Sequence, residues 1–213
     1  MGPGQKFLTV TLWGLLVVAM LALVGSGVLA TRQDSTRPIT LEPEQEQHLP
    51  PLFDAPGFSL TDQNNRNITT ETLRGRVWIA SFVFTQCAGP CPMMTAKMAS
   101  LQEAIPNPRV MLVSFTVDPE RDTPEVLKTY ADQFGADESR WHTLTGTQDQ
   151  MMDVARGMYI TAIPATDDSP IIHSERFLLV DHEGVIRGIY SSGDPEQMKA
   201  LADDARELAE QAS

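Results

Sequence analysis

The chain has 213 residues, of which 42% are hydrophobic, and its formal charge at pH 7 is −12. So acidic a protein is a poor direct partner for nucleic acid or for anionic lipid headgroups, because both carry negative charge themselves. About 180 residues remain once an apolar N-terminal segment is set aside, which is enough for one domain with a well-buried core.

That apolar segment, residues 7–30, contains no charged side chain. As a helix it would be roughly 36 Å long, more than the ~30 Å hydrocarbon core of a bilayer. We therefore expect a transmembrane anchor there, with residues 1–6 in the cytoplasm and the acidic remainder exported. A cleaved signal peptide is the alternative, because residues 28–30 (Val-Leu-Ala) resemble a cleavage site. Either interpretation places the cysteines of the chain in an oxidising compartment.

Residues 31–51 are rich in Gln, Glu and Pro, a composition typical of an extended tether. We expect residues 52–213 to form the folded domain. Its first segments, around residues 58–60 and 67–70, flank a polar turn and predict a small hairpin.

A run at residues 77–84, apolar except for Ser81, predicts a buried strand. A helix should follow, with Pro92 at its first position, where a missing N–H costs nothing. Four side chains at spacings of four, three and four residues give this helix one apolar face: Met94, Met98, Leu101 and Ile105. The run at residues 110–117 predicts a second buried strand, parallel to the first and joined to it by a right-handed crossover.

Three more helices and a hairpin follow. The helix boundaries are marked by Thr123 with Pro124 and Gly135, by a capping box of Thr147 and Gln150 with Gly157, and by Asp194 with Pro195. Residues 177–180 and 185–190 flank a turn and predict an antiparallel hairpin. The order β-α-β-α, a further helix, β-β-α predicts an α/β, thioredoxin-like fold with an N-terminal transmembrane helix, its strands in one sheet and helices on both faces.

The only two cysteines, Cys87 and Cys91, lie between the first buried strand and its helix. A helix N-terminus lowers the pKa of a thiol, so we expect both to favour the thiolate that binds metals or attacks disulfides. A structural disulfide between them would close a loop of about five residues and contribute only roughly 2 kcal/mol, which a domain of this size does not need. Thiol redox chemistry and metal binding both remain open.

The spacing of the cysteines bears on the redox alternative. Redox enzymes of this fold usually carry two residues between the cysteines, whereas Cys87 and Cys91 are separated by three. The peroxidase pattern is absent, because Thr85 lies only two positions before Cys87.

Metal binding needs further ligands, and the candidates are the four histidines: His48, His142, His173 and His182. We expect His48 in the tether and His182 in a turn to face solvent, and His142 to pack or to face water. His173 immediately precedes the C-terminal hairpin, and in this fold the loop that enters this hairpin passes close to the N-terminus of the cysteine-bearing helix. His173 is therefore the candidate that can join the cysteines.

Two thiolates and one imidazole would form a three-coordinate site of soft donors. A structural zinc site takes four protein ligands and no fourth is evident, whereas copper, as Cu(I) or Cu(II), suits this donor set. Met93 and Met94 could add a thioether, although core packing is the expectation for both. Because the thiols must be reduced before they bind, a thiol reductant is an expected partner.

Three separated motifs resemble the Sco/SenC family of membrane-anchored copper proteins that assist cytochrome c oxidase assembly. They are the cysteine-bearing run at residues 82–92, the acidic segment at residues 117–124, and His173-Ser174 ahead of residues 177–181. The resemblance implies a thioredoxin-like domain that binds one copper ion. It also implies two partners, the copper-bearing subunit of cytochrome c oxidase and a copper donor protein. With the expected anchor, it implies a single-pass protein of the bacterial inner membrane whose head lies in the periplasm.

Matched by motif, the family's copper ligands fall on Cys87, Cys91 and His173. The family's acidic signature falls on Asp118 and Asp122. Asp118 would then either assist partner or metal exchange or cap a helix together with Thr123. Gln86 occupies a position where relatives often carry histidine, but this position is not among the family's ligands.

Two main hypotheses follow, and they use the same cysteines. The first is a copper metallochaperone, rather than an enzyme, that delivers copper to the binuclear copper site of the oxidase. The second is a membrane-anchored thiol–disulfide oxidoreductase that reduces the cysteines of that oxidase subunit. An anchored scaffold without chemistry is the least favoured, because the cysteine arrangement is reactive.

Overall fold

The computed structural model describes residues 48–87, 89–160, 162–163, 172–173 and 175–212. The cytoplasmic stretch, the anchor and most of the tether expected for residues 1–47 lie outside this part of the chain. Within it, no helix is both long and apolar enough to cross a membrane. Gln47–Ser213 form one compact unit.

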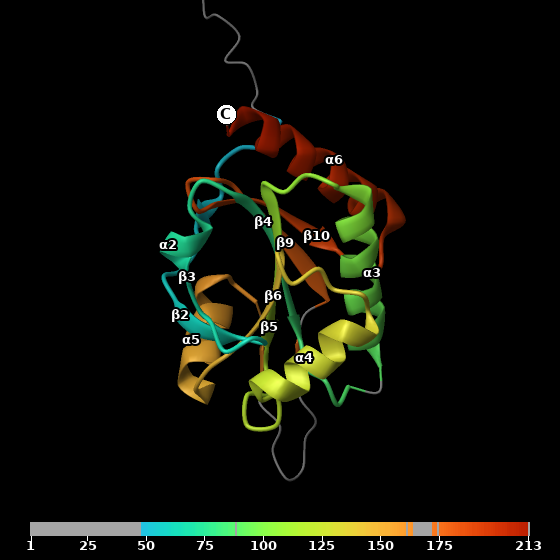
Figure 1. The fold of residues 1–213 in the computed structure, drawn as a ribbon. Coiled ribbons are helices and arrows are strands. Elements are labelled where there is room, and N and C mark those ends of the chain that lie inside the picture. The colour runs from blue at the N-terminus through green and yellow to red at the C-terminus, as the bar shows by residue number, and fades with distance from the viewer. Residues whose placement is uncertain (1–47, 88, 161, 164–171, 174, 213) are drawn as a thin grey trace, which may run out of the picture. The chain divides into compact units, whose positions relative to one another are not determined.

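An eight-stranded sheet forms the centre of this unit, in the order β1-β10-β9-β4-β5-β6-β2-β3 (Figure 1). Its strands are β1 (Phe53–Asp54), β2 (Ser59–Asp62), β3 (Asn67–Thr69), β4 (Val77–Val83), β5 (Val110–Thr116), β6 (Trp141–Thr145), β9 (Arg176–Val180) and β10 (Val185–Ser191). Two short strands, β7 (Ala162–Ile163) and β8 (Ile172–His173), pair only with each other in a separate ladder.

The central strands match the sequence prediction. β4 and β5 are buried along their whole length and pair in parallel, from Val77 opposite Val110 to Val83 opposite Thr116. The early hairpin is confirmed as β2 and β3, with Leu60 opposite Ile68. The C-terminal hairpin is confirmed as β9 and β10, which pair antiparallel.

The parallel strand β6 was not predicted. Three of its five residues are polar, yet all five are buried. Gln63 satisfies two backbone groups of this strand, donating to the Trp141 carbonyl at 2.8 Å and accepting from the Thr143 N–H at 2.8 Å. A residue almost 80 positions upstream therefore makes a polar segment stable in the interior, which no local pattern reveals.

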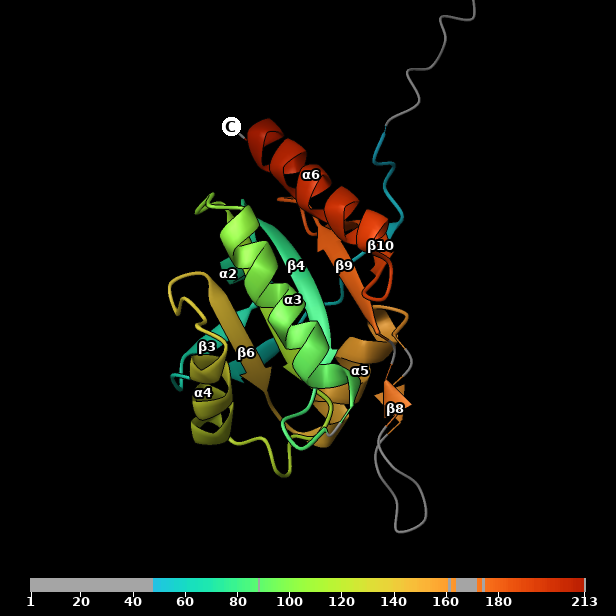
Figure 2. The same cartoon turned by 90° about the vertical axis from the view of Figure 1, so that its right-hand side faces the viewer.

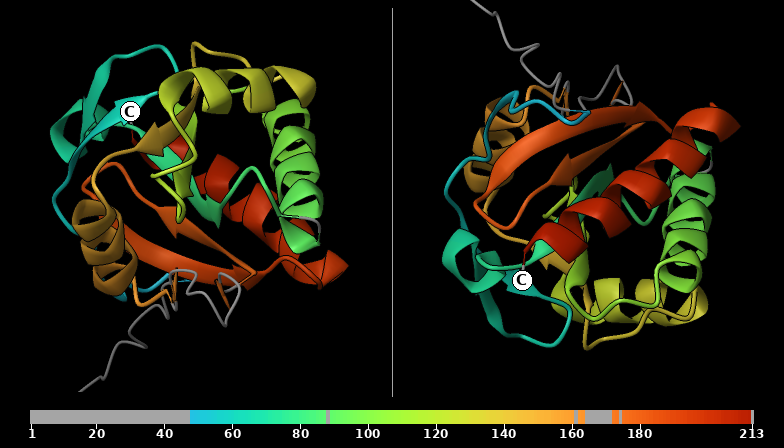
Figure 3. Two further views of the ribbon diagram at one scale, coloured as in Figure 1. Left: turned by 90° about the horizontal axis from the view of Figure 1, so that it is seen from below. Right: turned by 90° about the horizontal axis from the view of Figure 1, so that it is seen from above.

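Helices cover both faces of the sheet (Figures 1 and 3). On one face lie α3 (Pro90–Ala104) and α6 (Pro195–Gln211). These helices bury Met98 and Leu201, respectively, completely. The helix α4 (Pro124–Gln133) lies beside α3. The other face packs α5 (Gln148–Gly157) and the short α2 (Thr70–Leu73). This arrangement is the α/β, thioredoxin-like layering that the order of elements predicted.

The predicted helix caps are present. Thr123 accepts a hydrogen bond from Val126 N–H at the start of α4, and Asp194 caps α6. Thr147 and Gln150 form the capping box of α5. Gly135 follows α4 with φ +67°, a conformation that favours glycine. One boundary was wrong, because α3 begins at Pro90, two residues before Pro92.

The folded unit starts before residue 52, the predicted boundary between tether and domain. Leu49 is 7% exposed and belongs to the core beneath α6. Its carbonyl oxygen accepts hydrogen bonds from the guanidinium of Arg187 on β10. The last residues assigned to the tether are therefore docked on the domain.

Candidate metal centre

Both cysteines lie at the junction of β4 and α3. Cys87 ends a turn that begins at Phe84, and its N–H donates to the Phe84 carbonyl at 3.4 Å. Its side chain is half-buried. Cys91 is the second residue of α3 and is fully buried. The two thiols are not joined in a disulfide, and they are hydrogen-bonded to each other. The sequence prediction that they share one strand-to-helix junction is confirmed.

The expectation that the helix start lowers both thiol pKa values is wrong for Cys91. Burial raises the pKa of the Cys91 thiol strongly, and its hydrogen bond with Cys87 acts in the same direction. A backbone hydrogen bond with Phe84 lowers this pKa but is too weak to compensate. Removing a charged thiolate from water costs more than the helix terminus returns. Cys91 is therefore a neutral thiol until a cation or an oxidant replaces its proton.

Asp122 fixes the turn that carries the cysteines. Its carboxylate is completely buried and accepts hydrogen bonds from the Thr85 hydroxyl at 2.5 Å and from the Thr85 N–H at 3.2 Å. The hydroxyl of Thr116, at the end of β5, donates to the same carboxylate. Burial raises the pKa of Asp122, although the hydroxyls of Thr116 and Thr85 act against the shift. Asp122 thus ties the cysteine turn to the neighbouring strand.

Asp118, the other acidic residue of the motif, has a different setting. Its carboxylate accepts a hydrogen bond from the Arg121 guanidinium at 2.9 Å, and its N–H donates to the Thr116 hydroxyl at 3.0 Å. Thr123, and not Asp118, caps α4. Asp118 therefore shapes the loop after β5 rather than the helix start.

Three residues that support this site were not found from the sequence. Thr95 donates to the Cys91 carbonyl at 2.9 Å, and its hydroxyl lies 2.8 Å from that of Tyr130 on α4. Burial raises the pKa of Tyr130, although its hydrogen bond with Thr95 acts against the shift. Tyr130 and Thr85 also line a pocket of about 410 Å³ against α4. Thr85 could have been found from its position two residues before Cys87. No sequence pattern near Thr95 or Tyr130 indicates that these residues support the cysteines.

His173 lies in β8, where it pairs with Ala162 of β7. Figure 2 places β8 at the same end of the domain as the N-terminus of α3. The side chain of His173 lies outside what the structure describes, so its assignment as a ligand stays a prediction.

The other histidines lie apart from the cysteines. His142 is buried in β6, where its Nδ1 lies 3.1 Å from Asp62, and burial lowers its pKa. His182 is half-buried in the turn between β9 and β10. The His48 side chain is 70% exposed, as expected, but its Nε2 lies 3.1 Å from Asp204.

The two methionines differ from each other. Met94 packs in the core at 1% exposure, as predicted. Met93 is 60% exposed, so the expectation that it packs in the core is wrong. The first turn of α3 directs neighbouring side chains to different faces, and Met93 falls on the outer one.

Layers, topology and paired thiols define a thioredoxin-like α/β domain with a dithiol at a strand-to-helix junction. The SCO1/SenC family model matches residues 47–210, and the chain belongs to this family. It is 35% identical over 144 residues to the SCO1 protein homolog of Bacillus subtilis, covering 65% of this chain and 74% of that protein.

Two solved structures share the fold. One is BsSco, a member of the Sco family of cytochrome c oxidase assembly proteins in which a disulfide switch was identified. It has a TM-score of 0.69 and 30% identity, over 78% of this chain and 99% of that one. The other is Arabidopsis thaliana ScoI with copper bound, with a TM-score of 0.63 and 28% identity, over 74% of this chain and 98% of that one.

Proposed function

We propose that this protein is a copper metallochaperone that delivers copper to the binuclear copper site of cytochrome c oxidase during assembly. The observation that carries the proposal is the pair of hydrogen-bonded thiols at the start of α3, which are not joined in a disulfide. Membership of the SCO1/SenC family and the likeness to a copper-bound relative support it.

Copper is the cargo that this donor set suits. Cys87 and Cys91 supply two sulfur ligands, and His173 is the proposed third ligand. Thiolates and an imidazole in low coordination number favour Cu(I) or Cu(II) over the harder cations. The proposed stoichiometry is one copper ion for each chain.

The setting of the dithiol fits a protein that hands its cargo on. Cys87 is half-buried and reachable, whereas Cys91 is enclosed by the core and by Thr95. The proposed partners are the copper-bearing oxidase subunit, a copper donor protein and a thiol reductant, with no role for nucleic acid. The proposed location is the bacterial inner membrane, with residues 7–30 as the single span and the domain in the periplasm.

The test is a titration of the reduced full-length chain with Cu(II). Sulfur-to-copper charge-transfer absorption should rise to a plateau at one equivalent of copper. His173→Ala should weaken copper binding by about tenfold or more, because one of three ligands is lost. Cys87→Ser and Cys91→Ser should each remove the charge-transfer band.

His182→Ala is the matched control, because it removes an imidazole from the turn between β9 and β10 without touching the proposed ligands. It should leave copper affinity unchanged. Equal affinities of His173→Ala and the parent protein would refute the assignment of His173. Absence of a charge-transfer band in the parent protein would refute copper carriage by the dithiol.

A thiol–disulfide oxidoreductase is the second candidate, and the contact between the two reduced thiols favours it. In this reaction the Cys87 thiolate attacks a target disulfide, forms a mixed disulfide and releases one target thiolate. Cys91, losing its proton to solvent, attacks the Cys87 sulfur, releases the second target thiolate and forms the Cys87–Cys91 disulfide. A thiol reductant must then restore the dithiol. His173→Ala separates the two functions, because it should weaken copper binding but spare this exchange.

A further inference from the structure

A second cluster of metal-ligating side chains lies where the chain enters the domain. His48 precedes the first strand, and Asp204 and Glu207 lie on α6 at a spacing of three residues, which places them on one helix face. One ligand atom from each of these three residues lies within 4.8 Å of the other two. Figures 1 and 2 place the C-terminal end of α6 at the opposite end of the domain from the N-terminus of α3, so this cluster is separate from the dithiol.

The distances suit a shared cation. The Nε2 atom of His48 lies 3.1 Å from Oδ1 of Asp204. Two ligands bound to one zinc ion at 2.0–2.2 Å in tetrahedral geometry are separated by about 3.4 Å. The third ligand comes from Glu207, whose exposed side chain can rotate toward the ion.

Neighbouring residues orient both carboxylates. The Tyr190 hydroxyl donates to Oδ2 of Asp204 at 2.6 Å, and the Gln211 amide donates to Oε1 of Glu207 at 3.1 Å. The Gln211 bond engages only one oxygen of Glu207. Both oxygens of Asp204 have a partner, because Oδ1 is hydrogen-bonded to Nε2 of His48, so a bound cation would replace the proton that His48 and Asp204 share. Hydrogen bonds of this kind, from residues outside the ligand set, are typical of metal sites.

The site is built on a fixed backbone and is open to solvent. Asp204 is only 7% exposed, and Leu49, next to His48, is anchored in the core. His48 and Glu207 line a pocket of about 400 Å³, through which an ion can enter. Arg187 lines the same pocket, but its guanidinium is engaged by the Leu49 carbonyl and by Asp181.

We propose that His48, Asp204 and Glu207 form a binding site for a divalent transition-metal ion such as Zn²⁺. One imidazole and two carboxylates match the preference of Zn²⁺ for nitrogen and oxygen ligands. Such an ion would join the segment entering the domain to the last helix, because His48 and the two carboxylates come from opposite ends of the folded unit. The site would therefore hold residues 48–51 against α6.

The test uses the full-length chain carrying Cys87→Ser and Cys91→Ser, so that the dithiol cannot bind the probe. Calorimetric titration with Zn²⁺ should show one bound equivalent. His48→Gln and Glu207→Gln should each weaken binding about tenfold or more. A Zn²⁺-dependent rise in the melting temperature should disappear in His48→Gln.

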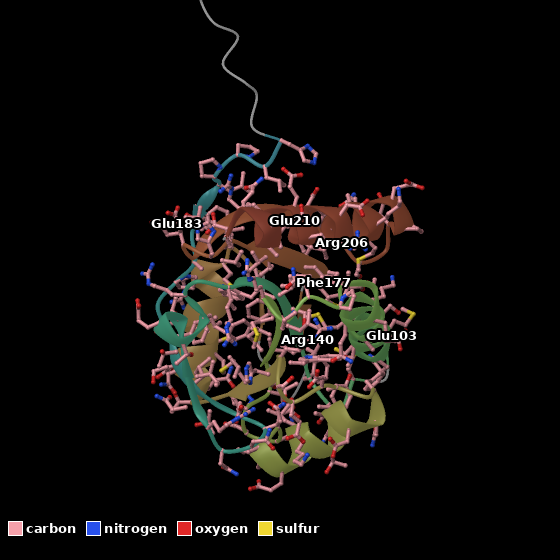
Figure 4. All side chains as sticks on the ribbon, turned by 45° about the horizontal axis from the view of Figure 1, so that its top comes forward. Glu103, Arg140, Phe177, Glu183, Arg206 and Glu210 are labelled. Atoms are coloured by element: carbon pink, nitrogen blue, oxygen red, sulfur yellow. The ribbon has the colours of Figure 1, made fainter. Side chains whose placement is uncertain are left out.

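Two matched controls accompany these variants. Glu210→Gln removes a carboxylate from the same helix, α6, on which Figure 4 labels Glu210. His182→Gln removes a histidine from the turn between β9 and β10. Both should leave Zn²⁺ affinity within about twofold of the parent. Absence of Zn²⁺ binding, or an affinity that His48→Gln does not change, would overturn the proposal. Because the dithiol is absent from every variant, neither result depends on the copper function.

Discussion

The replacement of Asp122 by alanine tests whether this carboxylate holds the cysteine turn. The substitution removes three hydrogen bonds, from the Thr85 hydroxyl, the Thr85 N–H and the Thr116 hydroxyl. Hydrogen bonds to a charged group contribute about 1.5–3 kcal/mol each, and relief of burying the carboxylate offsets several kcal/mol of their sum. We therefore expect the free energy of unfolding to fall by roughly 2–4 kcal/mol.

Urea denaturation of the reduced chain at pH 7 measures this loss. Asp118→Ala is the matched control from the same loop, since it removes one ion pair with the half-exposed Arg121 and should cost less than about 1 kcal/mol. A loss below about 1 kcal/mol for Asp122→Ala, or equal losses for the two variants, would refute the reasoning.

Two further predictions concern the thiols and the acid side of the stability profile. Cys87 should be alkylated by iodoacetamide at pH 8 at least about tenfold faster than Cys91, because Cys91 is fully buried and its pKa is raised. Peptide mass spectrometry measures the two rates, and equal rates would contradict the prediction. Burial would raise the pKa of Asp62, but hydrogen bonds from the N–H groups of Arg66 and Asn64 and from the Arg66 guanidinium outweigh it and lower the pKa. A carboxyl group with a lowered pKa stabilises the folded state at pH values above its unfolded pKa of about 4, and this stabilisation is lost as the pH falls through the folded pKa. The parent protein should therefore lose unfolding free energy between about pH 5 and pH 2, and Asp62→Asn should lose less of it over the same range. Urea denaturation at a series of pH values measures both.

The elements that the sequence predicted are those whose stability comes from their own pattern. The short runs of β4 and β5, rich in β-branched and aromatic residues, favour buried strands, and the caps at Thr123 and Asp194 act on the next few residues. The strand β6 escaped prediction because its polar residues depend on Gln63 and Asp62, which lie far away in the sequence. A local sequence pattern therefore predicts a helix or strand well where the hydrogen bonds and apolar contacts of that element come from residues within it or next to it.

The site shows the same division. Its cysteines were evident from their spacing, but the effect of burial on the Cys91 pKa was not, because a helix start can be exposed or enclosed. The hydrogen bonds from Thr85 and Thr116 to Asp122 bring together two segments, the cysteine turn and the end of β5 with its following loop, which meet only in the folded chain. Met93 and Met94 are adjacent and chemically identical, and only the position of the core distinguishes them.

The charges around the dithiol bear on which of its two proposed functions the site favours. Asp122 adds negative charge near Cys91 and raises the pKa of that thiol further, beyond the effects of burial and Cys87. Two bare thiolates beside this carboxylate would repel one another in a region of low dielectric constant. A bound copper ion would supply the missing positive charge in place of the protons, whereas a nucleophilic thiolate on Cys91 would receive no such compensation. These charges support our proposal that the dithiol holds a cation rather than repeatedly attacking disulfides.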